Sequence, residues 1–95
     1  MLHFVYILHS DSRKLLYVGI TTHFEQRLSE HNNKELKFTS SGVPWTLLWH
    51  TIKSSNADAE LLERKLKNYS RQKKIKFLKN HSSGIVDHDI LHNLH

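Results

Sequence analysis

The sequence contains no cysteine, one proline, one methionine and only three glycines. The absence of cysteine excludes disulfide bonds and zinc sites built from cysteine thiolates. No apolar run approaches the roughly 18–20 residues that a membrane span requires. The opening residues, MLHFVYILHSD, lack a basic leader and a small-residue cleavage site, so no secretory signal is expected. We therefore expect no membrane association and, by default, a cytoplasmic protein.

What the chain does contain is an excess of positive charge. Its formal net charge is +5 with nine histidines taken as neutral. A length of 95 residues suits a single domain, and 38% hydrophobic with 24% charged residues is typical of a folded rather than a disordered chain. The basic balance favours a polyanionic partner, either nucleic acid or an anionic surface.

Two apolar runs near the N-terminus predict an antiparallel hairpin. The run HFVYILH (3–9) is nearly continuous, which favours a strand covered on both faces. A polar turn, SDSRK, separates it from a second predicted strand, LLYVGI (15–20). A turn centred on Asp11-Ser12 would place Tyr6 directly opposite Tyr17 on one face of the sheet.

The next segment, TTHFEQRLSEHNN, changes to a helical period. Thr22 and Glu25 have the spacing of a capping box at a helix start. Phe24, Leu28 and His31 follow one another at helical intervals, and the asparagine pair after them is expected to end the helix.

The remaining elements follow from turn residues, caps and apolar spacing. We predict a loop over 34–44, a strand over 45–53, a helix over 57–68 capped by Ser55 or Asn56, and a basic helix over 71–80 capped by Ser70. The order β-β-α-β-α-α predicts an α+β fold, in which a small three-stranded antiparallel sheet is flanked by helices. Residues 1–80 are assigned to one domain, and the histidine-rich residues 81–95 to a polar C-terminal tail. No native metal site is expected in this tail, although His88, His92 and His95 would suit zinc if it were helical.

Each candidate site residue admits two interpretations. Tyr6 and Tyr17 are either ordinary strand residues or paired phenols of a site. Gly19 favours a site, because glycine weakens a strand and often marks close approach of a ligand or another backbone. Arg27 and His31 share one side of the first helix, where they are either surface residues or a phosphate-binding guanidinium with an imidazole nearby.

The second helix carries Glu63, which has the spacing for an ion pair with Lys67. A lone carboxylate completed by waters and phosphate oxygens would alternatively suit Mg²⁺. The third helix is either a solvated face or a phosphate-binding surface of salt-sensitive, non-specific affinity; its basic residues are Arg71, Lys73, Lys74, Lys76 and Lys79. Trp45 and Trp49 share strand parity; they could offer a stacking face, but core packing is the preferred expectation for both.

Taken together, residues 3–79 resemble the GIY-YIG nuclease domain, in its small single-domain endonuclease group. Phe4-Val5-Tyr6 and Tyr17-Val18-Gly19 match the two signature motifs in order and spacing, although phenylalanine and valines replace the signature glycine and isoleucines. Arg27 with His31 is similar to the family's first-helix arginine and the Tyr or His one turn later. No separate DNA-recognition domain is identified, so the resemblance does not indicate which target is recognised.

The resemblance implies a metal-dependent endonuclease that hydrolyses phosphodiester bonds in nucleic acid, with DNA expected and a role in repair or recombination. It implies catalytic roles for Tyr6, Tyr17, Arg27 and His31, with either phenol assisting the attacking water and Tyr17 preferred. Glu63 matches the family's acidic ligand for Mg²⁺ or Mn²⁺. The predicted nucleic-acid contacts are Gly19, Lys37, Arg71, Lys73, Lys74 and Lys76. The rival hypotheses are an inactive nucleic-acid-binding module of the same shape and a nuclease subunit that requires a protein partner.

Overall fold

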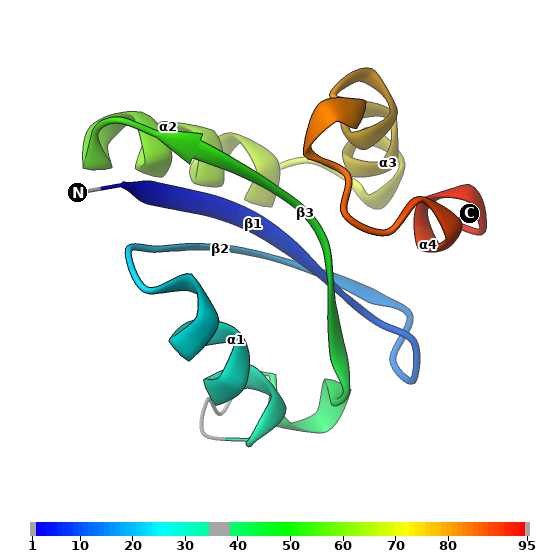
Figure 1. The fold of residues 1–95 in the computed structure, drawn as a ribbon. Coiled ribbons are helices and arrows are strands. Elements are labelled where there is room, and N and C mark those ends of the chain that lie inside the picture. Colours follow the sequence, from blue (N-terminus) through cyan, green and yellow to red (C-terminus); the bar gives the residue numbers. More distant parts are fainter. Residues whose placement is uncertain (1, 35–38, 95) are drawn as a thin grey trace.

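A computed structural model describes residues 2–34 and 39–94 of the chain. Three strands, β1 (His3–Ser10), β2 (Leu15–Thr21) and β3 (Trp45–Lys53), form one antiparallel sheet in the order β2-β1-β3. Helix α1 lies on one side of this sheet, and α2 and α3 lie on the other (Figure 1). The predicted α+β fold and its β-β-α-β-α-α order are confirmed, with short helices added near the C-terminus.

The register of the first hairpin differs from the prediction. Tyr6 pairs with Gly19, and Tyr17 pairs with Leu8, so the two tyrosines are diagonal rather than opposite neighbours. The prediction was wrong because the turn comprises the four residues 11–14, which moves the hairpin centre one position along the chain. A two-residue shift in pairing preserves the face of every side chain. Both phenol rings therefore still lie on the same face, with centroids 6.4 Å apart.

Helix α1 (Phe24–Asn32) brings Phe24 and Leu28 onto the sheet face that carries the tyrosines. Asn33 follows as its C-cap, as predicted. The predicted capping box is wrong, because the N-cap is His23 and no side chain caps this end of the helix. The Thr22 hydroxyl instead shares a 3.0 Å hydrogen bond with His23 Nδ1.

A bulge separates the two tryptophans of β3. Ile7 pairs with Trp49 but Leu8 pairs with Leu47, so one extra residue is inserted into β3 between these pairs. Side chains alternate faces along a strand, and an inserted residue reverses that alternation. Trp45 consequently packs on the tyrosine face and Trp49 on the other. Their predicted shared parity is wrong, whereas their predicted burial is confirmed.

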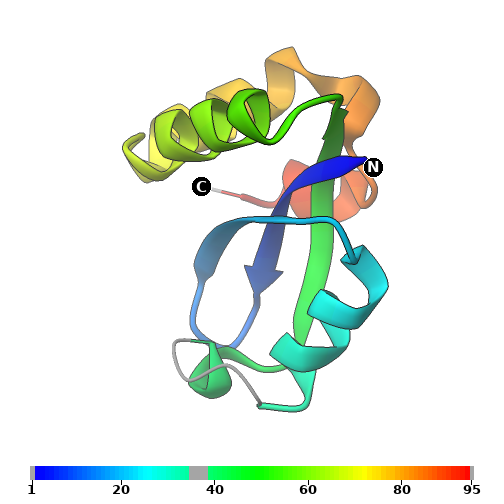
Figure 2. The same cartoon turned by 90° about the vertical axis from the view of Figure 1, so that its left-hand side faces the viewer.

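Helices α2 (Asn56–Lys67) and α3 (Arg71–Asn80) cover the second face of the sheet, as Figure 2 shows for α2 above the sheet and α1 below it. The Ser55 hydroxyl accepts a 3.1 Å hydrogen bond from the Asp58 backbone amide, so Ser55 rather than Asn56 caps α2. The Ser70 hydroxyl accepts a 3.2 Å hydrogen bond from the Lys73 backbone amide, which confirms Ser70 as the cap of α3. The buried core of this layer comprises Val5, Ile7, Val18, Leu48, Trp49, Ala59, Leu66, Ile75 and Leu78.

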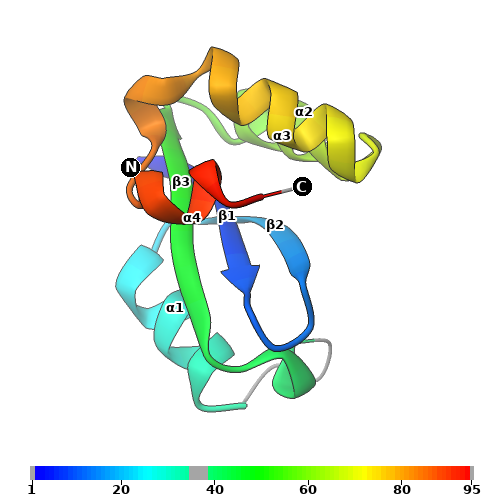
Figure 3. The same ribbon diagram turned by 90° about the vertical axis from the view of Figure 1, so that its right-hand side faces the viewer.

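The C-terminal segment folds back onto β3. A 3₁₀ turn (Ser82–Gly84) leads into a short helix, α4 (His88–His92), which lies beside β3 in Figure 3. The Val86 amide donates a 2.9 Å hydrogen bond to the Leu48 carbonyl. Ile85, Leu91 and Leu94 join the core formed by α2, α3 and the sheet. Residues 82–94 are therefore packed against the body of the protein.

Across residues 2–34 and 39–94, no helix has the length and apolar character needed to cross a membrane.

Candidate active site

A buried hydrogen-bond chain links β1 to α1 and to the segment after it. The Tyr6 hydroxyl lies 3.1 Å from His31 Nε2, and His31 Nδ1 lies 2.8 Å from the Thr39 hydroxyl. All three residues are buried. One arrangement gives both shared hydrogens an acceptor, with Tyr6 O–H donating to Nε2 and Nδ1–H donating to Thr39. These bonds hold the imidazole in one orientation beneath the sheet.

Burial determines the charge states of this pair. Burial raises the pKa of Tyr6 far above its usual range; neighbouring Tyr17, Glu63 and Glu30 raise it further, and only Arg27 acts in the opposite direction. Burial also lowers the pKa of His31, and the Arg27 guanidinium adds to that effect. Tyr6 is therefore a neutral hydrogen-bond donor and His31 a neutral imidazole at neutral pH. Such a phenol is a poor proton acceptor but a good positioning group.

Tyr17 has a different environment on the edge strand β2. It is partly exposed, and its ring lies edge-on to His31 with the centroids 4.8 Å apart. The Trp45 ring also lies edge-on to it, at a centroid distance of 6.0 Å. Its hydroxyl has no hydrogen-bond partner among residues 2–34 and 39–94. Of the two signature phenols, Tyr17 is the one whose hydroxyl remains available for a substrate or a water.

Gly19 makes room for Tyr6. A Cβ atom at this position would overlap the Tyr6 hydroxyl and the ring carbon that bears it. The space expected for a substrate beside Gly19 is therefore filled by the protein's own phenol. The glycine matters to the site because it lets Tyr6 pass under β2 and reach His31.

Arg27 lines a polar cleft of about 290 Å³. The cleft joins the end of β2, the first turns of α1 and the start of α2, through Thr21, Thr22, Gln26 and Asn56. Glu30 also lines it, so a bound anion would meet a guanidinium and several neutral donors beside one carboxylate. A larger cavity of about 660 Å³ lies on the β3 side of α1 and includes none of the predicted catalytic residues.

Glu63 lies on α2. Its Oε2 lies 3.3 Å from Lys67 Nζ, which is the ion pair that the helical spacing allowed. Its negative charge acts to raise the pKa of Tyr6, although burial is the main cause of that rise. No group of three or more His, Asp or Glu side chains is placed to hold a metal within the described part of the chain. A metal at Glu63 would have this one protein carboxylate as ligand.

The predicted basic residues of α3 differ in their contacts and in their burial. Arg71 Nη1 donates a 2.9 Å hydrogen bond to the Lys14 carbonyl in the hairpin turn. Lys74 is half-buried, which lowers its pKa, and Arg71 lowers it further. Lys73 and Lys76 line a groove between α3 and α2. Lys37 lies outside the described residues.

The sequence did not predict two residues of these sites, Thr39 beside His31 and Lys65 in the groove between α2 and α3. Thr39 belongs to a segment with no periodic pattern, and nothing in its spacing from His31 indicates a hydrogen bond. Lys65 lies on α2 and lines the groove with the α3 lysines. Its distance along the sequence from the α3 lysines does not predict that they meet, because the contact between α2 and α3 is a tertiary one.

The predicted site residues comprise two strand tyrosines on one sheet face, a helical Arg–His pair and a carboxylate on a second helix, and this combination defines a class of small α+β domain. The model of the GIY-YIG catalytic domain matches residues 2–76, and the chain belongs to the GIY-YIG family. The resemblance inferred from the motifs is thus confirmed.

Relatives of similar size support this assignment. The UPF0213 protein of Staphylococcus haemolyticus is 36% identical over 77 residues, which cover 80% of this chain and 93% of the relative. The UPF0213 protein of Lactococcus lactis subsp. cremoris is 38% identical over 80 residues, with coverages of 82% and 81%. The solution NMR structure of a UPF0213 protein from Bacillus halodurans matches with a TM-score of 0.57 at 31% identity, covering 83% of this chain and 84% of the other. None of these names states an activity.

Proposed function

We propose that the protein is a metal-dependent endonuclease that hydrolyses phosphodiester bonds in nucleic acid, with DNA as the expected substrate. The observation that carries this proposal is the cluster around His31. Tyr6 and Thr39 orient the imidazole through hydrogen bonds, and the Tyr17 ring packs edge-on against it with its hydroxyl unpaired within the described residues. Arg27, one turn earlier on the same helix, supplies the adjacent positive charge. Membership of the GIY-YIG family supports the reaction class.

In this mechanism the two tyrosines have separate roles. The Tyr17 hydroxyl contacts the attacking water and assists its deprotonation. Phenols generally release their proton near pH 10, so a phenol acts at neutral pH only beside positive charge, and Arg27 is the cation of this cluster. Tyr6 is a positioning residue, because it is buried and acts through its hydrogen bond to His31. The neutral imidazole in turn supports the ring of Tyr17.

Arg27 is assigned to the scissile phosphate. A guanidinium binds phosphate oxygens through two parallel hydrogen bonds, and its charge opposes the negative charge that grows as water attacks. The polar cleft beside it provides hydroxyl and amide groups for neighbouring phosphate oxygens. These contacts would orient the substrate and exclude competing positions of the water.

Glu63 fits the proposed Mg²⁺ or Mn²⁺. Mg²⁺ commonly keeps several waters and uses one or two carboxylates together with substrate phosphates. Only Oε2 of Glu63 is paired, and its Oε1 has no partner within the described part of the chain. When bound, the metal would polarise a phosphate oxygen and favour ionisation of a bound water. Lys67 balances the carboxylate charge in the absence of the ion.

A nicking assay tests the proposal directly. Purified protein is incubated with supercoiled plasmid and with duplex, flap, junction and single-stranded oligonucleotides in Mg²⁺, Mn²⁺ or EDTA. We expect metal-dependent cleavage that is lost in Tyr17→Phe and in Glu63→Ala. Lys67→Ala is the matched control, because it removes the other half of the ion pair and leaves the carboxylate in place. Full cleavage by both loss variants would overturn the site assignment.

The assay also separates the two alternatives. Binding without cleavage of any substrate would indicate the inactive nucleic-acid-binding module. Cleavage that appears only after addition of cell extract would indicate a subunit dependent on a protein partner.

A further inference from the structure

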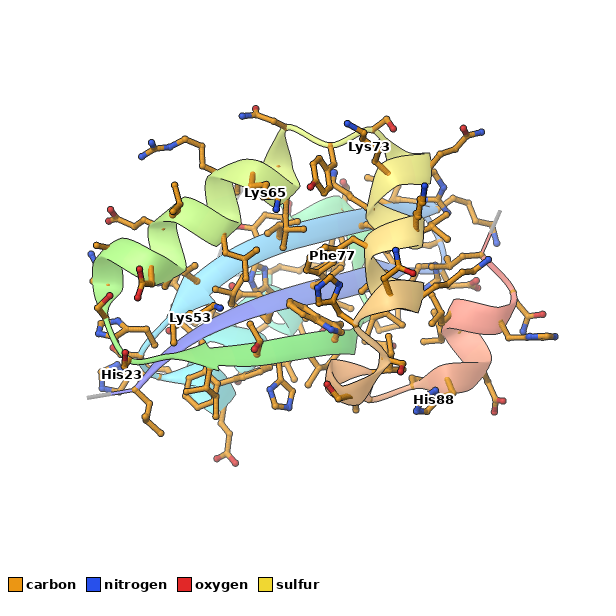
Figure 4. All side chains as sticks on the ribbon, turned by 90° about the horizontal axis from the view of Figure 1, so that it is seen from above. His23, Lys53, Lys65, Lys73, Phe77 and His88 are labelled. Carbon is orange, nitrogen blue, oxygen red and sulfur yellow. The ribbon has the colours of Figure 1, made fainter. Side chains whose placement is uncertain are left out.

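A second candidate site lies on the opposite layer of the molecule, between α2 and α3. This α2–α3 groove has a volume of about 250 Å³. It is lined by Lys65, Tyr69, Lys73, Lys76, Phe77 and His81 among others, and Figure 4 shows Lys65, Lys73 and Phe77 around the space between the two helices. The sheet separates it from the rings of Tyr6 and Tyr17, which face α1.

The charge of the α2–α3 groove has one sign. Three of its lining residues are lysines, and no lining residue is acidic. The Lys73 ammonium lies 5.2 Å from the centroid of the Tyr69 ring, so a cation–π contact holds it at the groove wall. Like charges gathered in one groove repel each other, and an anionic ligand relieves that repulsion.

The groove also contains a prepared aromatic surface. The His81 imidazole stacks on the Phe77 ring with a centroid distance of 4.0 Å and an interplanar angle of 20°. Its Nδ1–H donates a 2.9 Å hydrogen bond to the Phe77 carbonyl, which fixes the plane of the ring. Phe77 itself packs edge-on against the buried Trp49 at 5.3 Å. His81 is exposed, so a flat ring is presented to solvent on a rigid support.

We propose that the α2–α3 groove binds an unpaired nucleotide, whose base stacks on His81 and whose flanking phosphates contact Lys65, Lys73 and Lys76. Proteins bind single strands by combining a basic groove with aromatic rings on which bases stack. A base inside a duplex has both faces covered by its neighbours and cannot stack on such a ring. The preferred substrate would therefore carry a single-stranded segment, as a flap, gap or open junction does.

This inference rests on the proposed function only in taking nucleic acid as the substrate. The groove lies on the far layer from Tyr17, so it contributes affinity and substrate choice rather than a catalytic group. Substitutions in it should raise KM on flap substrates and leave kcat unchanged, whereas Tyr17→Phe should abolish kcat.

Binding measured without catalysis tests the inference. Fluorescence anisotropy in EDTA compares a labelled 20-nucleotide single strand with the duplex of the same sequence. We expect His81→Ala to weaken single-strand binding roughly tenfold, because base stacking on an aromatic side chain is of that order. His81→Phe should retain the affinity, since it keeps the ring. Duplex binding should change little in either variant.

Salt dependence tests the lysines. The double variant Lys73→Ala/Lys76→Ala should reduce the slope of log K against log salt for the single strand by about 1.4, because each neutralised phosphate contributes about 0.7. Lys79→Ala is the matched control, as an exposed lysine one turn further along α3 that does not line the groove. Its slope should remain at the wild-type value. Thermal melting of each variant establishes that the fold is retained.

The contrary outcomes are distinct. Equal binding by wild-type protein and His81→Ala, or equal slopes for the lysine double variant and Lys79→Ala, would overturn the α2–α3 groove as a nucleotide site. Because the lysines are tested separately from His81, loss of folding in one variant leaves the other measurement decisive. Absence of metal-dependent cleavage together with the expected binding pattern would instead refute the catalytic proposal and leave the groove intact.

Discussion

Tyr6 and Tyr17 show how one residue type takes two roles in adjacent strands. Tyr6 is in the central strand, where burial and the bond to His31 make it a fixed donor. Tyr17 is in the edge strand, where its ring is supported by His31 and its hydroxyl stays unpaired within the described residues. The difference follows from strand position, because a central strand is covered on both sides and an edge strand is not.

The two phenols should therefore differ in their contribution to stability. Tyr6→Phe leaves His31 Nε2 as a buried acceptor without a donor, which should lower the free energy of unfolding by about 1–3 kcal/mol. Tyr17→Phe removes a hydroxyl that has no protein partner and should change it by less than about 0.5 kcal/mol. Urea unfolding followed by tryptophan fluorescence measures both. A larger loss in Tyr17→Phe than in Tyr6→Phe would contradict the assignment of roles.

His31 should make stability depend on pH. Its pKa in the folded protein is lowered by burial, so the unfolded chain, with an ordinary histidine pKa of about 6.5, binds the proton more readily. Stability is then fully present above about pH 6.5 and falls as the pH decreases below it. His9 has a pKa lowered by burial as well and adds to the same trend.

Unfolding experiments at pH 7, 6 and 5 test this dependence. His31→Gln should show a shallower decline than wild-type protein, although its stability at pH 7 is lower because the hydrogen bonds of the imidazole are changed. His92→Gln, at an exposed position, provides the control. Parallel pH profiles for wild-type protein and His31→Gln would show that the imidazole carries no proton linkage.

Among the secondary-structure elements, the starts of α2 and α3 could be predicted from the sequence more reliably than the start of α1. Ser70 was predicted as a cap and Ser55 was one of two candidates, because a cap is a contact between residues three positions apart. The same rule failed at Thr22, where β2 runs on to Thr21 and helix α1 starts only after His23. The Thr21 hydroxyl accepts a hydrogen bond from the His23 amide, so the strand end and not the capping box sets this boundary.

Substitution of the two hydroxyls distinguishes a cap from a residue that only has cap spacing. Ser70→Ala should lower the free energy of unfolding by about 1 kcal/mol, because the Lys73 amide loses its acceptor. Thr22→Ala should cost clearly less, since no backbone amide of α1 depends on that hydroxyl. Thermal melting of both variants gives the comparison, and equal losses would favour the capping box after all.

For the molecule as a whole, the C-terminal segment is part of the packing. The indole of Trp49 donates a 3.0 Å hydrogen bond to the His81 carbonyl, and Gly84 sits so close to that indole that a Cβ atom would overlap it. Residues 85–94 then cover the outer side of β3 and add three aliphatic side chains to the core. Amphipathic patterning in this segment was obscured by the three histidines within its last eight residues.

Truncation after Asn80 measures the contribution of this segment. Burial of Ile85, Leu91 and Leu94 stabilises the fold by about 1.5–3 kcal/mol each as an upper range, so the truncated protein should melt at a much lower temperature. It should also bind a dye specific for exposed apolar surface. Val86→Ser is the control, because it changes an exposed apolar residue of the same segment and leaves the buried core residues in place. An unchanged melting temperature would show that residues 1–80 form an independent domain.

The order of the elements, the Ser70 cap of the third helix and the residues of the family signature could all be predicted from the sequence. Each depends on contacts between near neighbours or on motifs along the chain. The folded structure was needed to establish the Tyr6–Gly19 pairing, the opposite faces of Trp45 and Trp49, the Thr39 bond to His31 and the proximity of Lys65 to the α3 lysines. The opening hairpin was predicted, but its register depended on a turn of four residues and on the room that Gly19 leaves. Contacts between distant segments arise from packing of whole elements, and that packing left the partly exposed phenol at Tyr17.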